Sequence, residues 1–139
     1  MHTSQTLKEL VIRNYQTHGM AGGSVNVVQD FYTRQNGLLF IGTDPAERFE
    51  GYSNLLDYIS KNTSGGMNIQ IKFLDAFEQG EMGWSFDEIE LILSDGTKLP
   101  LRHTHVFERE NGAWRIVHTH ISFALPDKDL IRLAKENRI

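Results

Sequence analysis

The second half of the chain alternates apolar and polar residues in four consecutive segments, and this pattern constrains the fold more than any other feature. The segments are residues 68–77, 84–93, 99–109 and 114–123. A period of two is typical of strands that bury one face and expose the other. Turn residues separate the segments, and Asn111 with Gly112 forms the strongest hairpin signal. We therefore predict a four-stranded antiparallel meander.

The first half of the chain carries apolar residues at the spacing of helices. We predict one helix capped by Ser4, a second capped by Ser24 and a third capped by Ser53, which ends at residues 63–66. Short apolar or extended pieces at residues 37–42 and 48–50 interrupt them, and a short helix follows Pro126. Helices on one face of an antiparallel sheet form an α+β domain. We expect a single domain over residues 1–139, with a curved sheet and N-terminal helices enclosing a pocket.

Composition excludes several classes of function. The 139 residues have a formal net charge of −4 and no block of like charge, so we expect no nucleic-acid or membrane partner. The chain has no cysteine, which excludes disulfides, thiolate catalysis and cysteine-based zinc sites. The first residues lack a basic and apolar leader, and no apolar run reaches membrane length. We expect a cytoplasmic protein.

Four histidines near the C-terminus form two His-x-His pairs, His103 with His105 and His118 with His120. Two histidines separated by one residue on a strand point to the same side and can bind zinc, nickel or copper. A metal site needs a shared face as well as this spacing. Histidines in a half-polar sheet more commonly hydrogen-bond to neighbours, so we expect no bound metal and no cofactor.

The hairpin register decides which histidines lie together, and two registers are open. A two-residue type I′ turn at Asn111 and Gly112 pairs His105 with His118, so that all four histidines share one face. A bulge at Gly112 shifts the register by one residue and separates the two pairs. His103 and His105 then share a face with residues 117, 119 and 121, while His118 and His120 join Thr104, Val106 and Trp114.

Residues 40–52 and the hairpin of residues 102–122 resemble the SnoaL-like group of the nuclear-transport-factor-2-like (NTF2-like) superfamily. In the hairpin, Gly112-Ala113-Trp114 is followed by His118-Thr119-His120-Ile121-Ser122. The same hairpin is similar to that of the calmodulin-dependent kinase association domain. The resemblance covers roughly residues 7–125 and implies a cone-shaped, cystatin-like fold and a homodimer formed through the sheet.

The resemblance also bears on the register and on the ligand. The association domain favours the second register, in which the two histidine pairs lie on opposite faces. Its pocket carries arginines at the positions that His105 and Ile121 occupy here. The cationic clamp for anionic ligands is therefore largely missing, and the resemblance implies that His105 points into the cone.

The candidate catalytic residues are Asp87 and His105. Asp87 alternates with Ile89 and Leu91 onto the predicted inner face, where a carboxylic acid can act as a general acid or base. His105 lies opposite it as a proton partner. The candidate ligand-binding residues share this face: His103, Ile89, Phe107, Thr119 and Ile121. We expect Glu47, which follows Asp44 and Pro45, to stabilise a turn.

Three functions fit these features, because this fold supports many activities. The first is binding of a small, mostly apolar molecule without turnover. The second is an isomerase, cyclase or dehydratase in which Asp87 or His105 moves a proton beside a carbonyl. The third is a module that only dimerises. A buried carboxylate–histidine pair favours the enzyme, an apolar pocket favours binding, and a collapsed pocket favours the structural module.

Overall fold

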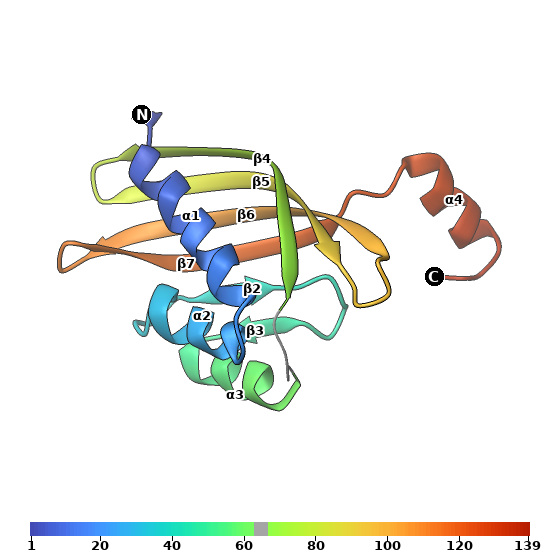
Figure 1. Ribbon diagram of the computed structural model, residues 1–139, viewed down its shortest axis with the longest axis horizontal. Coiled ribbons are helices and arrows are strands. Elements are labelled where there is room, and N and C mark those ends of the chain that lie inside the picture. The colour runs from blue at the N-terminus through green and yellow to red at the C-terminus, as the bar shows by residue number, and fades with distance from the viewer. Residues whose placement is uncertain (63–66) are drawn as a thin grey trace.

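The structure is a computed structural model, and it describes residues 1–62 and 67–139. These residues form four helices and one seven-stranded sheet of order β1-β4-β5-β6-β7-β2-β3 (Figure 1). The strands in this order are β1 (His2–Thr3), β4 (Asn68–Gln79), β5 (Met82–Ile92), β6 (Lys98–Glu110), β7 (Ala113–Phe123), β2 (Leu39–Ile41) and β3 (Arg48–Glu50). The predicted α+β class is confirmed.

Strands β4 to β7 form the predicted antiparallel meander, because each pairs with the next along the chain. The sheet is mixed, since β2 pairs with β7 in parallel and with β3 in antiparallel orientation. We call the face that carries Ala76, Ser85 and Asp87 the inner face, and the opposite face the outer face. Helix α1 (Gln5–His18) lies across the inner face (Figure 1).

The β6–β7 hairpin matches neither predicted register completely. Glu110 pairs with Ala113, and both Asn111 (φ 49°) and Gly112 (φ 81°) have the positive φ of a type I′ turn. The predicted bulge at Gly112 is therefore wrong. A bulge lies further along instead, because Phe107 pairs with Ile116 while Val106 pairs with His118.

Val117 is the extra residue in this bulge, and it shifts the register of everything beyond it. His105 pairs with Thr119 and His103 with Ile121 on the inner face. His118 and His120 pair with outer-face residues. The separation of the two histidine pairs is thus the one that the second register predicts. Trp114 lies on the turn side of the bulge, opposite Arg109, and so does not join His118 and His120.

Two of the three predicted helix caps are wrong. Ser4 caps α1 as predicted, and its Oγ accepts a hydrogen bond from the amide of Leu7 at 3.1 Å. Helix α2 (Gly23–Phe31) begins before Ser24, after Gly22 in the left-handed region (φ 68°). Helix α3 (Tyr52–Asn62) likewise begins before Ser53. The predicted end of this helix at residues 63–66 lies outside the described residues.

The core lies between α1, α2, α3 and the inner face. Its fully buried apolar side chains come from all of these layers and include Leu7, Leu55, Phe107 and Ile116. Each such side chain contributes about 1.5–3 kcal/mol by burial. Gly83 on β5 allows α1 to pack closely, because a Cβ there would lie 2.4 Å from Cδ1 of Leu7.

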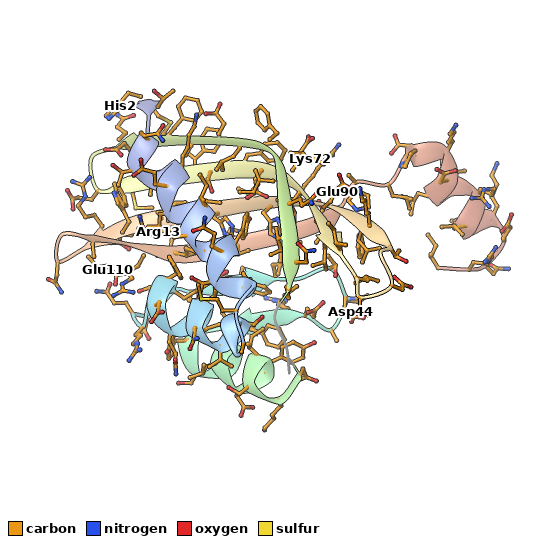
Figure 2. The ribbon with its side chains drawn as sticks, in the orientation of Figure 1. His2, Arg13, Asp44, Lys72, Glu90 and Glu110 are labelled. Carbon is orange, nitrogen blue, oxygen red and sulfur yellow. The ribbon has the colours of Figure 1, made fainter. Side chains whose placement is uncertain are left out.

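The C-terminal helix and the surface contribute little to this core. Helix α4 (Asp127–Lys135) begins after Pro126 as predicted, extends away from the sheet and has no buried residue (Figure 1). Lys72 on β4 and Glu90 on β5 project close together (Figure 2), with Nζ of the lysine 2.7 Å from Oε1 of the glutamate. None of the described helices has the length and hydropathy that crossing a membrane requires.

Candidate functional site

A cavity of about 310 Å³ lies between the inner face and helices α1 to α3. Its volume is at the lower end of the range of small-molecule sites, which is roughly 300–1,000 Å³. Most of the wall is apolar, and these side chains come from α2, α3 and the strands. They include Val27, Val28, Leu55, Ile59, Ile69, Ile89, Leu91, Leu101 and Ile121.

Polar side chains gather on one part of the wall around Asp87. The Asp87 carboxylate is completely buried and has two partners. The Tyr15 hydroxyl donates to Oδ2 of Asp87 at 2.5 Å, and Nδ1 of His103 lies 3.0 Å from Oδ1. Tyr15 and His103 are themselves buried. The carboxylate therefore connects helix α1 to strand β6 through charge-assisted hydrogen bonds.

A second set of contacts extends from Tyr15 to Tyr32, the residue that follows helix α2. Nε2 of His105 lies 3.1 Å from the Tyr15 hydroxyl, and its Nδ1 lies 2.8 Å from Oγ1 of Thr119. The Thr119 hydroxyl is in turn 2.9 Å from the hydroxyl of Tyr32. We call the six side chains the polar network. They are Tyr15, Tyr32, Asp87, His103, His105 and Thr119.

The chemistry of these groups assigns a direction to every hydrogen bond in the polar network. A carboxylate only accepts, so Tyr15 and Nδ1 of His103 both donate to Asp87. The Tyr15 oxygen then accepts from Nε2–H of His105. A neutral imidazole has one N–H, so Nδ1 of His105 accepts from Thr119, which accepts from Tyr32. All donors thus point along the chain of contacts toward Asp87.

Burial shifts the pKa values of three ionisable groups near the cavity, His105, His18 and Tyr15, toward their neutral forms. Desolvation lowers the pKa of His105 from 6.5 to about 3, although the nearby Asp87 charge acts in the opposite direction. Desolvation likewise lowers the pKa of His18 to about 4. Burial and the adjacent Asp87 raise the pKa of Tyr15 well above its usual value.

His103 is the member of the polar network with a ring nitrogen to offer a ligand. Its Nδ1–H binds Asp87, so in the neutral ring Nε2 carries a lone pair. This nitrogen has no hydrogen-bond partner among residues 1–62 and 67–139, and His103 lines the cavity. His105 differs, because both of its nitrogens already have partners.

The structure brings most of the predicted site residues to the cavity wall. His103, His105, Ile89, Thr119 and Ile121 line it. Asp87 does not reach the wall, because Tyr15 and His103 occupy its oxygens.

Phe107 does not line the cavity, although we expected it to contact the ligand. It is completely buried in the core, with its ring centroid 6.0 Å from that of His105. Glu47 has the expected structural contact, because its Oε1 accepts from the amide of Asp44 at 2.9 Å. Asp44 lies in the β2–β3 loop (Figure 2), which forms part of the wall.

Sequence reasoning missed the contribution of helix α1. Helical spacing places Tyr15 on the buried, mostly apolar side of this helix, yet its hydroxyl joins the two halves of the polar network. Asn14 and His18 also line the cavity. The available signal was the presence of three hydrogen-bonding side chains, at positions 14, 15 and 18, on the buried side of an amphipathic helix.

The histidines do not form a metal site in the described part of the chain, which contains no group of three or more metal-ligating side chains. His118 and His120 lie on the other side of the strand from His103 and His105. Nδ1 of His118 lies 2.9 Å from the carbonyl oxygen of Leu39 on β2.

A curved mixed sheet with helices enclosing a cavity defines the cystatin-like, NTF2-like class of α+β folds. A family profile described as the SnoaL-like domain matches residues 11–126, and the chain belongs to this family. No curated protein matches the sequence.

Solved structures agree with this fold at low sequence identity. An NTF2-like protein of unknown function from Pseudomonas putida has 15% identity and a TM-score of 0.70, over 90% of this chain and 99% of that one. A candidate ketosteroid isomerase from Parabacteroides distasonis has 14% identity and a TM-score of 0.73, over 88% and 91%. A candidate calcium/calmodulin-dependent protein kinase II association domain from Xanthomonas campestris has 18% identity and a TM-score of 0.67, over 87% and 86%. These similarities concern the fold, because one fold hosts many functions.

Proposed function

We propose that this protein binds a small, mostly apolar organic molecule in the cavity between α1, α2, α3 and the inner face. The observation that carries this proposal is the uneven wall, which is apolar over most of its area and polar around His103. Such a wall removes a hydrocarbon skeleton from water while a few polar groups orient it. The open cavity supports binding over a purely structural role. We also propose a cytoplasmic location and a homodimer.

Blocking the cavity tests this proposal. Tetralin, a bicyclic hydrocarbon, is a suitable probe, and saturation-transfer NMR reports its binding. Ile121→Trp places an indole in the cavity and should abolish the signal. Ile131→Trp on the exposed side of α4 is the matched control and should leave it unchanged. Failure of tetralin to bind the wild-type protein, or equal binding by Ile121→Trp, contradicts the proposal.

A second candidate function is proton transfer, as in an isomerase, cyclase or dehydratase. The buried Asp87–His103 pair favours it, because Asp87 holds the tautomer in which Nε2 of His103 is a base. His103 would touch the substrate and remove a proton beside a carbonyl. Asp87 would act as a positioning residue, and His105 would support Tyr15 rather than react.

Hydrogen–deuterium exchange tests this second function. The ketone 2-tetralone has exchangeable protons beside its carbonyl, and NMR in D₂O follows their loss after subtraction of the buffer rate. Exchange should be faster with the wild-type protein and fall to the buffer rate with His103→Gln. His120→Gln, on the outer face, is the matched control. An unchanged rate with His103→Gln contradicts this role.

A further inference from the structure

Asn14 is a buried polar side chain that the polar network does not use. It lies on α1 beside Tyr15, is 2% exposed and lines the cavity. None of the side-chain hydrogen bonds of the described residues involves its carboxamide, and the one buried atom without a partner among them is Oγ of Ser85, so the carboxamide is open to the cavity rather than enclosed in the core. A carboxamide offers two N–H donors and an accepting oxygen. Leaving such a group unpaired in a protein interior is unfavourable, so a molecule in the cavity gains by pairing with it.

His103 presents the complementary requirement in the wall of the same cavity. Its ring packs against Tyr15, the neighbour of Asn14, with centroids 5.4 Å apart. Its Nε2 lone pair can only accept while Asp87 holds the proton on Nδ1. An amide donor on α1 and an imidazole acceptor on β6 therefore line the same cavity. A ligand group that accepts a hydrogen bond from the Asn14 amide and donates one to Nε2 of His103 pairs with both side chains.

Charge narrows the chemistry of the ligand further. No lysine or arginine among the described residues lines the cavity, and the one charged residue in its wall is Glu47. His18, one turn after Asn14, is neutral at neutral pH because its pKa is about 4. A carboxylate or phosphate would lose its hydration without gaining a counter-charge. The cavity therefore favours a neutral ligand.

We propose that Asn14 and His103 form a hydroxyl-binding subsite and that the preferred ligand is a neutral alcohol on an apolar skeleton. The hydroxyl oxygen accepts from Nδ2 of Asn14, and its hydrogen is donated to Nε2 of His103. The hydrocarbon part fills the apolar portion of the wall. This inference rests on the proposed binding function, and Asn14 is its specificity-determining residue. A ketone can pair with Asn14 alone, because its oxygen has no hydrogen to give to His103.

Four probes of one skeleton test the subsite: tetralin, 2-tetralol, 2-tetralone and 1,2,3,4-tetrahydro-2-naphthoate. Dissociation constants from NMR titration should place the alcohol first, the ketone second, the hydrocarbon third and the carboxylate last. We expect the alcohol to bind about tenfold more tightly than tetralin, because two net hydrogen bonds correspond to roughly 5- to 150-fold in affinity. This order in the wild-type protein tests the proposal without any variant.

Asn14→Leu supplies the residue-specific test. It should remove the preference for 2-tetralol over tetralin while tetralin still binds, and Asn26→Leu on the exposed side of α2 should preserve that preference. Equal binding of alcohol and hydrocarbon by the wild-type protein overturns the subsite but leaves the binding function intact. The carboxylate or ketone as the tightest probe also overturns it. Failure of all four probes to bind overturns both proposals.

Discussion

Nδ1 of His103 lies 3.0 Å from Oδ1 of Asp87, and the two side chains are 8% and 0% exposed. The contact fixes which ring nitrogen of His103 carries hydrogen, because a carboxylate accepts and never donates. The chemical character of Nε2 of His103 is thus set by a residue that a ligand does not touch.

Asp87→Asn should change the tautomer of His103. Tyr15 and His103 both donate to residue 87, and a carboxamide has one accepting oxygen for the two donors. With this oxygen toward Tyr15, the amide nitrogen faces the His103 N–H, and the histidine relieves the conflict by moving its hydrogen from Nδ1 to Nε2. Nitrogen-15 NMR of the imidazole distinguishes the two forms. We also expect a loss of about 1–3 kcal/mol in the free energy of unfolding. Asp57→Asn, an exposed residue paired with Lys61, should show neither effect. A retained Nδ1–H signal for His103 would contradict the assignment.

Tyr15→Phe should destabilise the protein by about 1–3 kcal/mol, because it leaves Asp87 with one donor fewer and Nε2–H of His105 without an acceptor. Chemical denaturation measures this free energy of unfolding. Tyr52→Phe is the control, since the Tyr52 ring contacts the Arg34 guanidinium through its face, 4.8 Å from the centroid. Equal stability of the two variants would show that the Tyr15 hydroxyl is not part of a connected network.

Stability should fall as the pH drops below about 6.5. The folded protein lowers the pKa of His105 to about 3 and that of His18 to about 4, while the unfolded chain binds these protons near the ordinary value of 6.5. The unfolded state therefore holds more protons throughout this window. Each histidine contributes up to about 1.4 kcal/mol per pH unit within it. The contribution is present above pH 6.5 and is lost as the pH falls toward 4 for His18 and 3 for His105.

Denaturation of His18→Gln over the same pH range isolates one of these contributions. Its free energy of unfolding should vary less steeply between pH 6.5 and 4 than that of the wild-type protein. Parallel curves for the wild-type and His18→Gln proteins would contradict a lowered pKa for His18.

We predict that the protein forms a homodimer through the outer face of β4 and β5. Two aromatic pairs lie there, Phe73 with Phe86 (centroids 6.0 Å apart) and Phe77 with Trp84 (4.9 Å). Phe73 is 49% exposed in the single chain, and a second copy would cover it. Light scattering should report a dimer at micromolar concentration and a monomer for Phe73→Glu. Ile12→Glu on α1 is the control for adding a charge elsewhere. A monomeric wild-type protein would contradict the prediction.

The meander was predictable because an alternating pattern over ten or more residues specifies both strand and buried face. Strand β1 was not, since two residues carry no period. The predicted caps at Ser24 and Ser53 were wrong because a serine near the start of a helix does not indicate at which residue the helix begins. At α2 the helix begins after Gly22, whose left-handed backbone conformation sets the start. The bulge at Val117 lies inside β7, whereas the predicted registers differed only at the turn, so neither of them contained it.

Alternation brought Asp87, His103 and His105 to the correct face, because parity along a strand is a local property. Their partners are not local. Tyr15 and Asp87 are 72 residues apart, and Tyr32 and Thr119 are 87 apart. The sequence pattern of an amphipathic helix is the same whether the hydroxyl of its buried tyrosine ends in the core or hydrogen-bonds to a distant carboxylate. Phe107 shows the converse, since a residue on the correct face lies too deep to meet a ligand.

The extra residue in β7 puts the two halves of the hairpin out of phase. The half near the turn, where Arg109 stacks 4.4 Å over Trp114, and the half that lines the cavity keep separate alternations. Deleting Val117 should therefore leave His105 opposite Thr119. Deleting one residue between Thr119 and Phe123 should instead put the rest of that strand out of step with β6. Tetralin binding should survive the first deletion and be lost with the second. The number of residues in β7 beyond the bulge therefore determines which side chains form the cavity wall, even where the residue types stay the same.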